Sequence, residues 1–137
     1  MREAVFELLE RINKLDDRGA QINELRKAAN GRFQELLQYS LHPAVVFDLP
    51  EGPAPFKPTD DTSTHGLFWQ EIRRLYVFQK GRTQLPAARR EQIYIEMLEN
   101  IHPKDAELLQ LIKDRKWPYE NISLELVNEA FPLLIGE

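Results

Sequence analysis

The sequence predicts an all-α fold: a compact bundle of about six to seven short helices, with a Pro-rich extended loop at residues 43–65 strapped across it. Two observations predict this class. Apolar residues recur at three- and four-residue steps along most of the chain, as on the buried face of a helix. No two neighbouring segments show the alternation of apolar and polar residues that is typical of paired strands. The chain has 137 residues, 42% of them hydrophobic and 29% charged, so we expect residues 1–137 to form one α-helical domain.

Three helices are expected before the loop. Residues 2–16 carry apolar side chains at helical spacing, and the following acidic turn ends at Gly19, which is a plausible stop for the first helix. A second helix is expected to carry the same period from Ile22 until Asn30 and Gly31 interrupt it. A short third helix follows from residue 33 to residue 41, and Pro43 ends it because the residue before a proline avoids helical geometry.

The loop has a composition unlike the rest of the chain. Residues 45–47 favour extended structure, and residues 50–58 contain four of the nine prolines. Such a run favours polyproline II structure or a series of turns, and a connection of this length inside a small domain is usually mobile or part of a binding surface.

Four helices are expected after the loop. Their limits follow from apolar periodicity and from the residues that end or begin helices, namely Gly81, Pro86, Pro103 and Pro132. Ser123 is expected to cap the last helix. We expect them at residues 67–78, 86–101, 103–116 and 124–130.

Composition excludes several classes of protein. The chain has no cysteine, which removes disulfides, thiolate zinc sites and cysteine nucleophiles. Its longest apolar runs have about five residues, too short to span a bilayer, and the acidic start does not resemble a signal peptide. A net charge of −4 gives no global reason to bind nucleic acid or membranes. We therefore expect a soluble intracellular protein.

Catalytic and metal-binding patterns are also missing from the sequence. The three histidines are scattered, and no glycine-rich phosphate loop occurs. The nearest metal-like group is Asp60, Asp61 and His65, but it lies in a polar loop where acidic side chains are simply solvated. We expect no catalytic residue, metal or cofactor, and a protein that is not an enzyme.

One basic segment stands out, from Ile72 to Arg90, which contains six cations and no acid. On neighbouring helices these side chains could bind phosphates or an acidic partner. The alternative is that they pair with nearby acids and complement the C-terminal end of a helix. The candidate anion- or nucleic-acid-binding residues are Arg73, Arg74, Lys80, Arg82, Arg89 and Arg90. Because the whole chain is acidic, we expect any nucleic-acid binding to be weak and salt-dependent.

The Pro-rich loop supplies the other candidate surface. It could dock a protein partner through Pro53, Pro55, Phe56 and Lys57, with Phe56 as the apolar anchor. The alternative is a strap that packs over the helices, with its aromatic side chains filling the edge of the core.

Five segments carry a resemblance to known proteins: Leu36–Tyr39, Leu49–Pro58, Glu71–Phe78, Ala88–Glu91 and His102–Ala106. They resemble a family of small uncharacterised proteins from large T-even-like tailed phages, including phages that infect cyanobacteria, over roughly residues 1–132. The proline loop is the most specific element, although Ala54 and Phe56 replace the Pro and Tyr that are more frequent there.

The resemblance implies a viral protein made in the cytoplasm of an infected bacterium, and it carries over no catalytic residue. Our leading hypothesis is a non-enzymatic protein that binds a host or phage protein and modulates a host or phage process during infection. The alternatives are a nucleic-acid-associated accessory protein that uses the basic 72–90 face and a small virion component. The sequence does not predict the oligomeric state.

Overall fold

A computed structural model describes residues 3–59, 62–132 and 134. Within these residues it contains α-helices and two 3₁₀ segments but no sheet, which confirms the all-α prediction. The elements are α1 (Val5–Asn13), α2 (Arg18–Lys27), α3 (Gly31–Leu41), η1 (Thr62–Gly66), α4 (Leu67–Glu71), η2 (Ile72–Phe78), α5 (Ala87–Asn100), α6 (Pro103–Lys113) and α7 (Leu124–Ala130).

Side-chain caps place most of the helix starts. Asn30 caps α3 by accepting from Phe33 N–H at 3.0 Å, and Ser123 caps α7 as expected by accepting from Leu126 N–H at 3.1 Å. The expected stop at Gly19 is wrong. Asp17 accepts from Ala20 N–H at 2.8 Å and starts α2, so Gly19 lies in the first turn of a helix rather than after the end of one.

The helix expected at residues 67–78 is divided into α4 and the 3₁₀ segment η2. The buried residues of η2 are Ile72, Leu75 and Phe78. This spacing of three places all of them on one face of a 3₁₀ helix, which has three residues per turn. The segment ends before Gly81, whose φ of 86° is a conformation that glycine adopts without strain.

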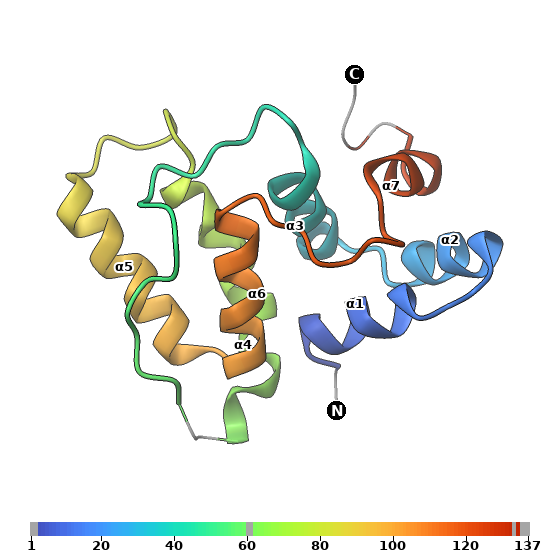
Figure 1. Cartoon of the computed structure of the whole chain (residues 1–137), viewed down its shortest axis with the longest axis horizontal. Coiled ribbons are helices and arrows are strands. Elements are labelled where there is room, and N and C mark those ends of the chain that lie inside the picture. The colour runs from blue at the N-terminus through green and yellow to red at the C-terminus, as the bar shows by residue number, and fades with distance from the viewer. Residues whose placement is uncertain (1–2, 60–61, 133, 135–137) are drawn as a thin grey trace.

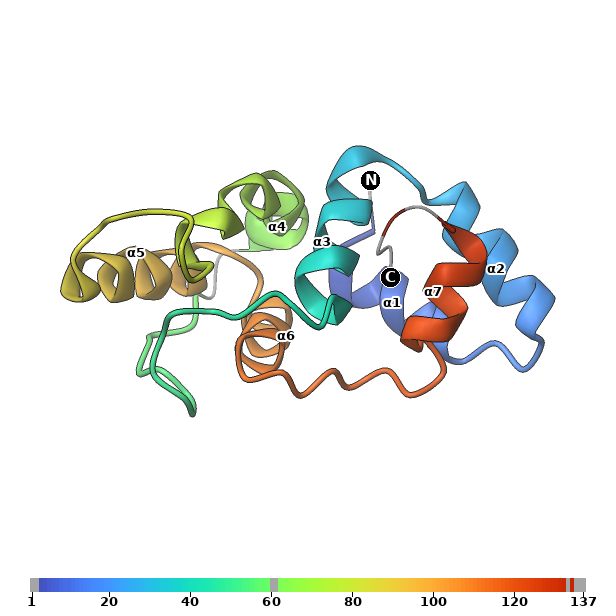
Figure 2. The same cartoon turned by 90° about the horizontal axis from the view of Figure 1, so that it is seen from above.

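The helices lie in two groups around a shared centre. Figures 1 and 2 show α5 on one side, α1, α2 and α7 on the other, and α3, α4 and α6 between them. The core is continuous through both groups. Its largest fully buried side chains include Phe33, Phe68, Phe78 and Tyr94, with Phe78 and Tyr94 packed edge to face at 5.3 Å between ring centres.

The Pro-rich loop extends along α5 and α6, as the green segment of Figure 1 shows. We call its described part, residues 43–59, the strap. A single antiparallel bridge pairs Phe47 with Gln79, and two hydrogen bonds flank it: Asp48 N–H to Phe78 O at 2.7 Å and Lys80 N–H to Val46 O at 2.8 Å. The expected strap is therefore present. Its predicted C-terminal bound is too long, because residues 62–65 belong to η1.

Candidate functional site

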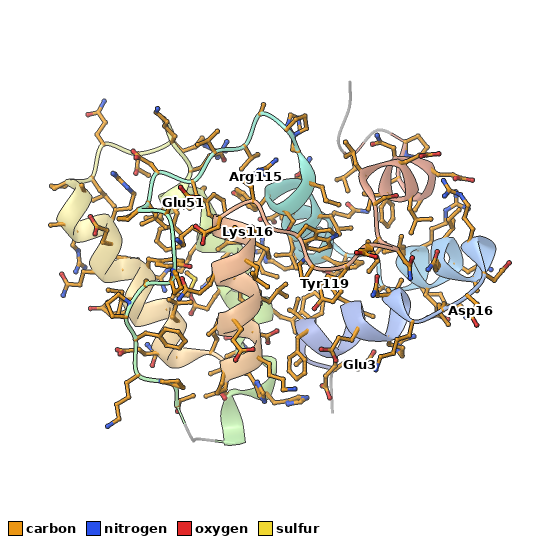
Figure 3. The ribbon with its side chains drawn as sticks, in the orientation of Figure 1. Glu3, Asp16, Glu51, Arg115, Lys116 and Tyr119 are labelled. Atoms are coloured by element: carbon orange, nitrogen blue, oxygen red, sulfur yellow. The ribbon has the colours of Figure 1, made fainter. Side chains whose placement is uncertain are left out.

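A buried ammonium group fastens the strap to the end of α6. Lys113 Nζ donates to Pro50 O at 2.7 Å, to Gly52 O at 2.7 Å and to Asp114 Oδ1 at 2.8 Å, and only 1% of its side chain is exposed. Gly52 adopts a φ of 91° and donates its own N–H to Asp114. Figure 3 shows the neighbouring Glu51 close to the end of α6. This geometry satisfies the buried charge, since each hydrogen of the ammonium has an acceptor.

Side chains of α5 and α6 also form hydrogen bonds with backbone groups of the strap. Gln110 makes a paired contact with Ala54, accepting from its N–H and donating to its O, both at 3.1 Å. Tyr94 donates to the same Gln110 oxygen at 3.0 Å, and Glu99 accepts from Lys57 N–H at 2.9 Å. An extended proline-rich chain makes no internal hydrogen bonds, so these contacts hold it in one conformation.

The four predicted docking residues divide between two faces of the strap. Phe56 is half-buried and packs against the core, whereas Pro53, Pro55 and Lys57 are exposed. Pro53 and Pro55 line a hollow of about 220 Å³ between the strap and α5. Packing on the core and presentation of an outer surface are thus combined in one segment, and partner binding by these residues stays a prediction.

The six predicted cations do not form one surface, because Arg90 points inward. It is 8% exposed and donates to Asp48 O at 2.8 Å and to Leu85 O at 2.9 Å, with the Asp48 carboxylate 3.1 Å away. The expectation that Arg90 joins an exposed anion-binding set is wrong for this reason. Its guanidinium instead ties the start of α5 to the strap.

The other five cations are exposed but differ in their partners. Arg74 pairs with Glu71 at 2.8 Å, as the alternative interpretation of this segment expected. Arg89 donates to Gln92 at 3.2 Å within α5. Arg73 and Lys80 extend from η2 and from the loop that follows it. Of these five cations, Arg82 is the one that lines a hollow in the surface.

Arg82 contacts one tyrosine and shares the lining of a hollow with another. Its guanidinium carbon is 5.9 Å from the centre of the Tyr76 ring, within the range of a cation–π contact. It also lines a hollow of about 270 Å³, which we call the Tyr–Arg hollow. The hollow lies between the end of α3 and the loop after η2 and is lined by Glu35, Gln38, Tyr39, His42, Ala44, Val45, Gln79 and Arg82.

Three side chains at the Tyr–Arg hollow, those of Tyr39, His42 and Arg82, can donate hydrogen bonds. Burial raises the pKa of Tyr39, and the Arg82 charge only partly offsets this, so the phenol keeps its proton at neutral pH. His42 Nδ1 accepts from Ala44 N–H at 3.0 Å, and a neutral ring held in this way carries its hydrogen on Nε2. Arg82 uses one described N–H, at 3.2 Å to Gln79 Oε1. Glu35 is engaged by Arg32 at 2.5 Å.

Sequence reasoning missed most of this surface. None of Tyr39, His42 and Tyr76 was singled out from the sequence as a surface residue, although Tyr76 is 42% exposed. One pattern could have indicated the exposure of Val46. It stands between Val45 and Phe47 in an extended segment, where alternate side chains point to opposite faces, and it is 52% exposed while both neighbours are buried.

Two of the scattered histidines meet at the N-terminal ends of α1 and α6. The His65 and His102 rings are 5.6 Å apart, and His65 Nε2 pairs with Glu7. A hydrogen bond from Ala4 N–H, together with the contact to His65, keeps the pKa of Glu7 below its usual range despite partial desolvation. His102 caps α6 by accepting from Lys104 N–H at 3.1 Å, and burial lowers its pKa.

Asp105 lies beneath these residues with 0% exposure. Its Oδ1 accepts from Phe6 N–H at 2.8 Å, whereas Oδ2 has no hydrogen-bond partner among the described residues. Burial raises the pKa of Asp105 to about 7, although the Phe6 hydrogen bond favours the charged form; the nearby charge of Glu7 raises the pKa further. Asp105 therefore titrates near neutral pH, which its expected place in the first turn of α6 did not indicate.

Residues 3–59, 62–132 and 134 contain neither a metal-binding cluster nor a membrane span. In that part of the chain no group of three or more His, Asp or Glu side chains could hold a metal ion. No helix there is both long and apolar enough to cross a bilayer. Asp60 and Asp61, considered above with His65, lie outside the described residues.

The fold and its surfaces define a small all-α protein with a proline-rich strap fixed to its helices and a tyrosine- and arginine-lined hollow beside it. The chain belongs to a family of unknown function, DUF6433, whose model matches residues 8–118. No curated protein and no solved structure matches the chain.

Proposed function

We infer that this chain is a non-enzymatic phage protein that binds a host or phage protein in the cytoplasm of the infected bacterium and thereby modulates a process of infection. The phage assignment is supported by the resemblance of five segments, above all the proline loop, to proteins of T-even-like phages. The binding assignment is supported by the surface around Arg82.

One observation carries the binding proposal: large apolar side chains are exposed on the two segments that the Phe47–Gln79 bridge joins. Val46 and Tyr76 are 52% and 42% exposed, the two highest values among the large apolar side chains of the described residues. Arg82 covers part of the Tyr76 ring. Tyrosine and arginine are enriched at protein interfaces, where they often supply most of the binding energy.

The same segments are held rigidly. Backbone hydrogen bonds on either side of the bridge join the strap to the end of η2, and Arg90 binds the strap from α5. A surface that is already ordered loses less conformational entropy when it binds a partner. The exposed Pro53 and Pro55 lie further along the same strap, beside α5.

The alternative function, nucleic-acid binding, is favoured by the exposed Arg73, Lys80, Arg82 and Arg89 in a segment without acids. The inward position of Arg90, the Arg74–Glu71 pair and the net charge of −4 argue against it. Few phosphate contacts of this kind give weak, strongly salt-dependent affinity. A small virion component is the third possibility, and mass spectrometry of purified particles would detect it.

Affinity capture from infected-cell lysate tests the proposal. Wild-type protein, Tyr76→Ala and Leu124→Ala are compared with and without nuclease; Leu124, also exposed at 36%, lies on α7 and serves as the matched control. We expect one protein to be retained by the wild type and by Leu124→Ala in both arms, and to be lost from Tyr76→Ala. Capture that requires intact nucleic acid, or that is unchanged by Tyr76→Ala, would overturn the proposal.

A further inference from the structure

We propose that the Tyr–Arg hollow receives the carboxylate of an Asp or Glu side chain from an acidic, extended segment of the protein partner. This inference rests on the proposed function, from which it takes the assumption that the partner is a protein. It adds the chemistry by which the partner is recognised.

Three side chains that line the hollow, those of Arg82, Tyr39 and His42, are donors that suit a carboxylate. A guanidinium has five N–H donors, of which Arg82 uses one in the described contacts. The Tyr39 phenol keeps its proton, and His42 carries its remaining hydrogen on Nε2. A carboxylate has two oxygens and about four acceptor positions, so it can take hydrogen bonds from several of these donors at once.

The charge balance favours a singly charged group. Arg82 and Glu35 are the charged residues that line the hollow, and Arg32 engages Glu35. One exposed guanidinium beside a carboxylate can balance one negative charge, but it leaves a phosphate dianion partly uncompensated. The volume of about 270 Å³ accommodates a single side chain rather than a run of nucleotides.

The surroundings favour further acidic residues next to the inserted one. Lys80 is exposed directly after Gln79, which lines the hollow, and the segment from Ile72 to Arg90 contributes no acid. The nearby Asp48 carboxylate is paired with Arg90. Cations at the rim of an interface accelerate association with an oppositely charged partner more than they strengthen the final complex. The exposed Tyr76 ring beside Arg82 provides the apolar contact for such a segment.

The test is an NMR titration of the full-length ¹⁵N-labelled protein with defined probes. The probes are a ten-residue peptide rich in Glu and Asp, the same peptide with Gln and Asn in their place, a ten-nucleotide oligothymidine and inorganic phosphate. We expect saturable shifts at Tyr39, Gln79 and Arg82 with the acidic peptide alone. Arg82→Gln is expected to weaken that binding about tenfold or more, as loss of a charge-assisted contact does.

Two controls make the result specific. Arg18→Gln removes an arginine that is 49% exposed and pairs with acids of α7, so it should leave acidic-peptide binding unchanged. Tyr39→Phe removes only the phenol hydrogen-bond donor and should weaken binding without affecting the fold. Equal binding of acidic and amide peptides, shifts that map elsewhere, or tighter binding of oligothymidine or phosphate would overturn the proposal.

The capture experiment separates this inference from the proposed function. One outcome is that Tyr76→Ala loses the partner, whereas Arg82→Gln retains it and wild type retains it even with excess acidic peptide. In that case the carboxylate site is wrong and the proposed function holds. If the acidic peptide binds in an Arg82-dependent manner while no protein is captured, the carboxylate chemistry holds and the proposed function is wrong.

Discussion

Replacing Asp105 by asparagine should change how the stability of the protein depends on pH. The wild-type carboxyl group is fully buried with a pKa of about 7, against 3.8 when exposed. Between these pH values the folded protein binds more protons than the unfolded chain, so its free energy of unfolding falls as pH rises. The amide side chain of the Asp105→Asn variant would keep an oxygen to accept the Phe6 N–H and would never be charged.

The size of the effect follows from the difference in pKa. A carboxyl that titrates at about 7 rather than 3.8 costs about 4 kcal/mol of folding free energy once it is ionised. We expect Asp105→Asn and wild type to differ little near pH 4, and the variant to be the more stable by about 4 kcal/mol above pH 8. The lowered pKa of His102 acts in the opposite direction, because stability is lost as pH falls below 6.5. This loss occurs in both proteins and cancels in the difference.

Urea unfolding at intervals from pH 4.5 to 8.5 measures the effect. Asp16→Asn is the matched control, since Asp16 is exposed in the loop between α1 and α2 (Figure 3) and its variant should follow wild type at every pH. A constant destabilisation of Asp105→Asn across the whole range would refute the reasoning, because it would show that Asp105 is charged in the folded protein at all these pH values.

Two further predictions concern the strap. Lys113→Met leaves three acceptors without their ammonium donor, so unfolding free energy should fall by about 3–5 kcal/mol. Hydrogen exchange at the Gly52 and Ala54 amides should accelerate more than exchange within α3; equal acceleration everywhere would show that Lys113 does not specifically hold the strap. Phe56→Ala should cost only about 1–2 kcal/mol because the ring is half-buried, and a thermal melt that matches wild type would show that Phe56 does not help to hold the strap.

Most helix limits were predictable because they depend on local chemistry. Ser123 caps α7 through its own hydroxyl, and Pro103 at the start of α6 suits a position that needs no N–H donor. Gly19 shows where this local reasoning fails. Glycine is typical after a helix end, but here the Asp17 side chain accepts from the Ala20 amide and starts a helix around it.

The candidate surfaces could be predicted only in part, because they depend on contacts between distant segments. The basic segment was recognised from composition, but the burial of Arg90 requires the carbonyls of Asp48 and Leu85, and Asp48 lies 42 residues away. The meeting of His65 and His102 likewise depends on the packing of η1 against the start of α6. No pattern in the sequence expresses such proximity.

The central claim is that the surface around Tyr76 contacts a protein during infection, and site-specific photocrosslinking tests it most directly. Tyr76→p-benzoylphenylalanine and the control Leu124→p-benzoylphenylalanine would be expressed in infected cells and irradiated. We predict a light-dependent covalent adduct with one protein at position 76, which excess acidic peptide suppresses, and no such adduct at position 124. An adduct with nucleic acid, the same adduct at both positions, or none at position 76 would contradict the claim.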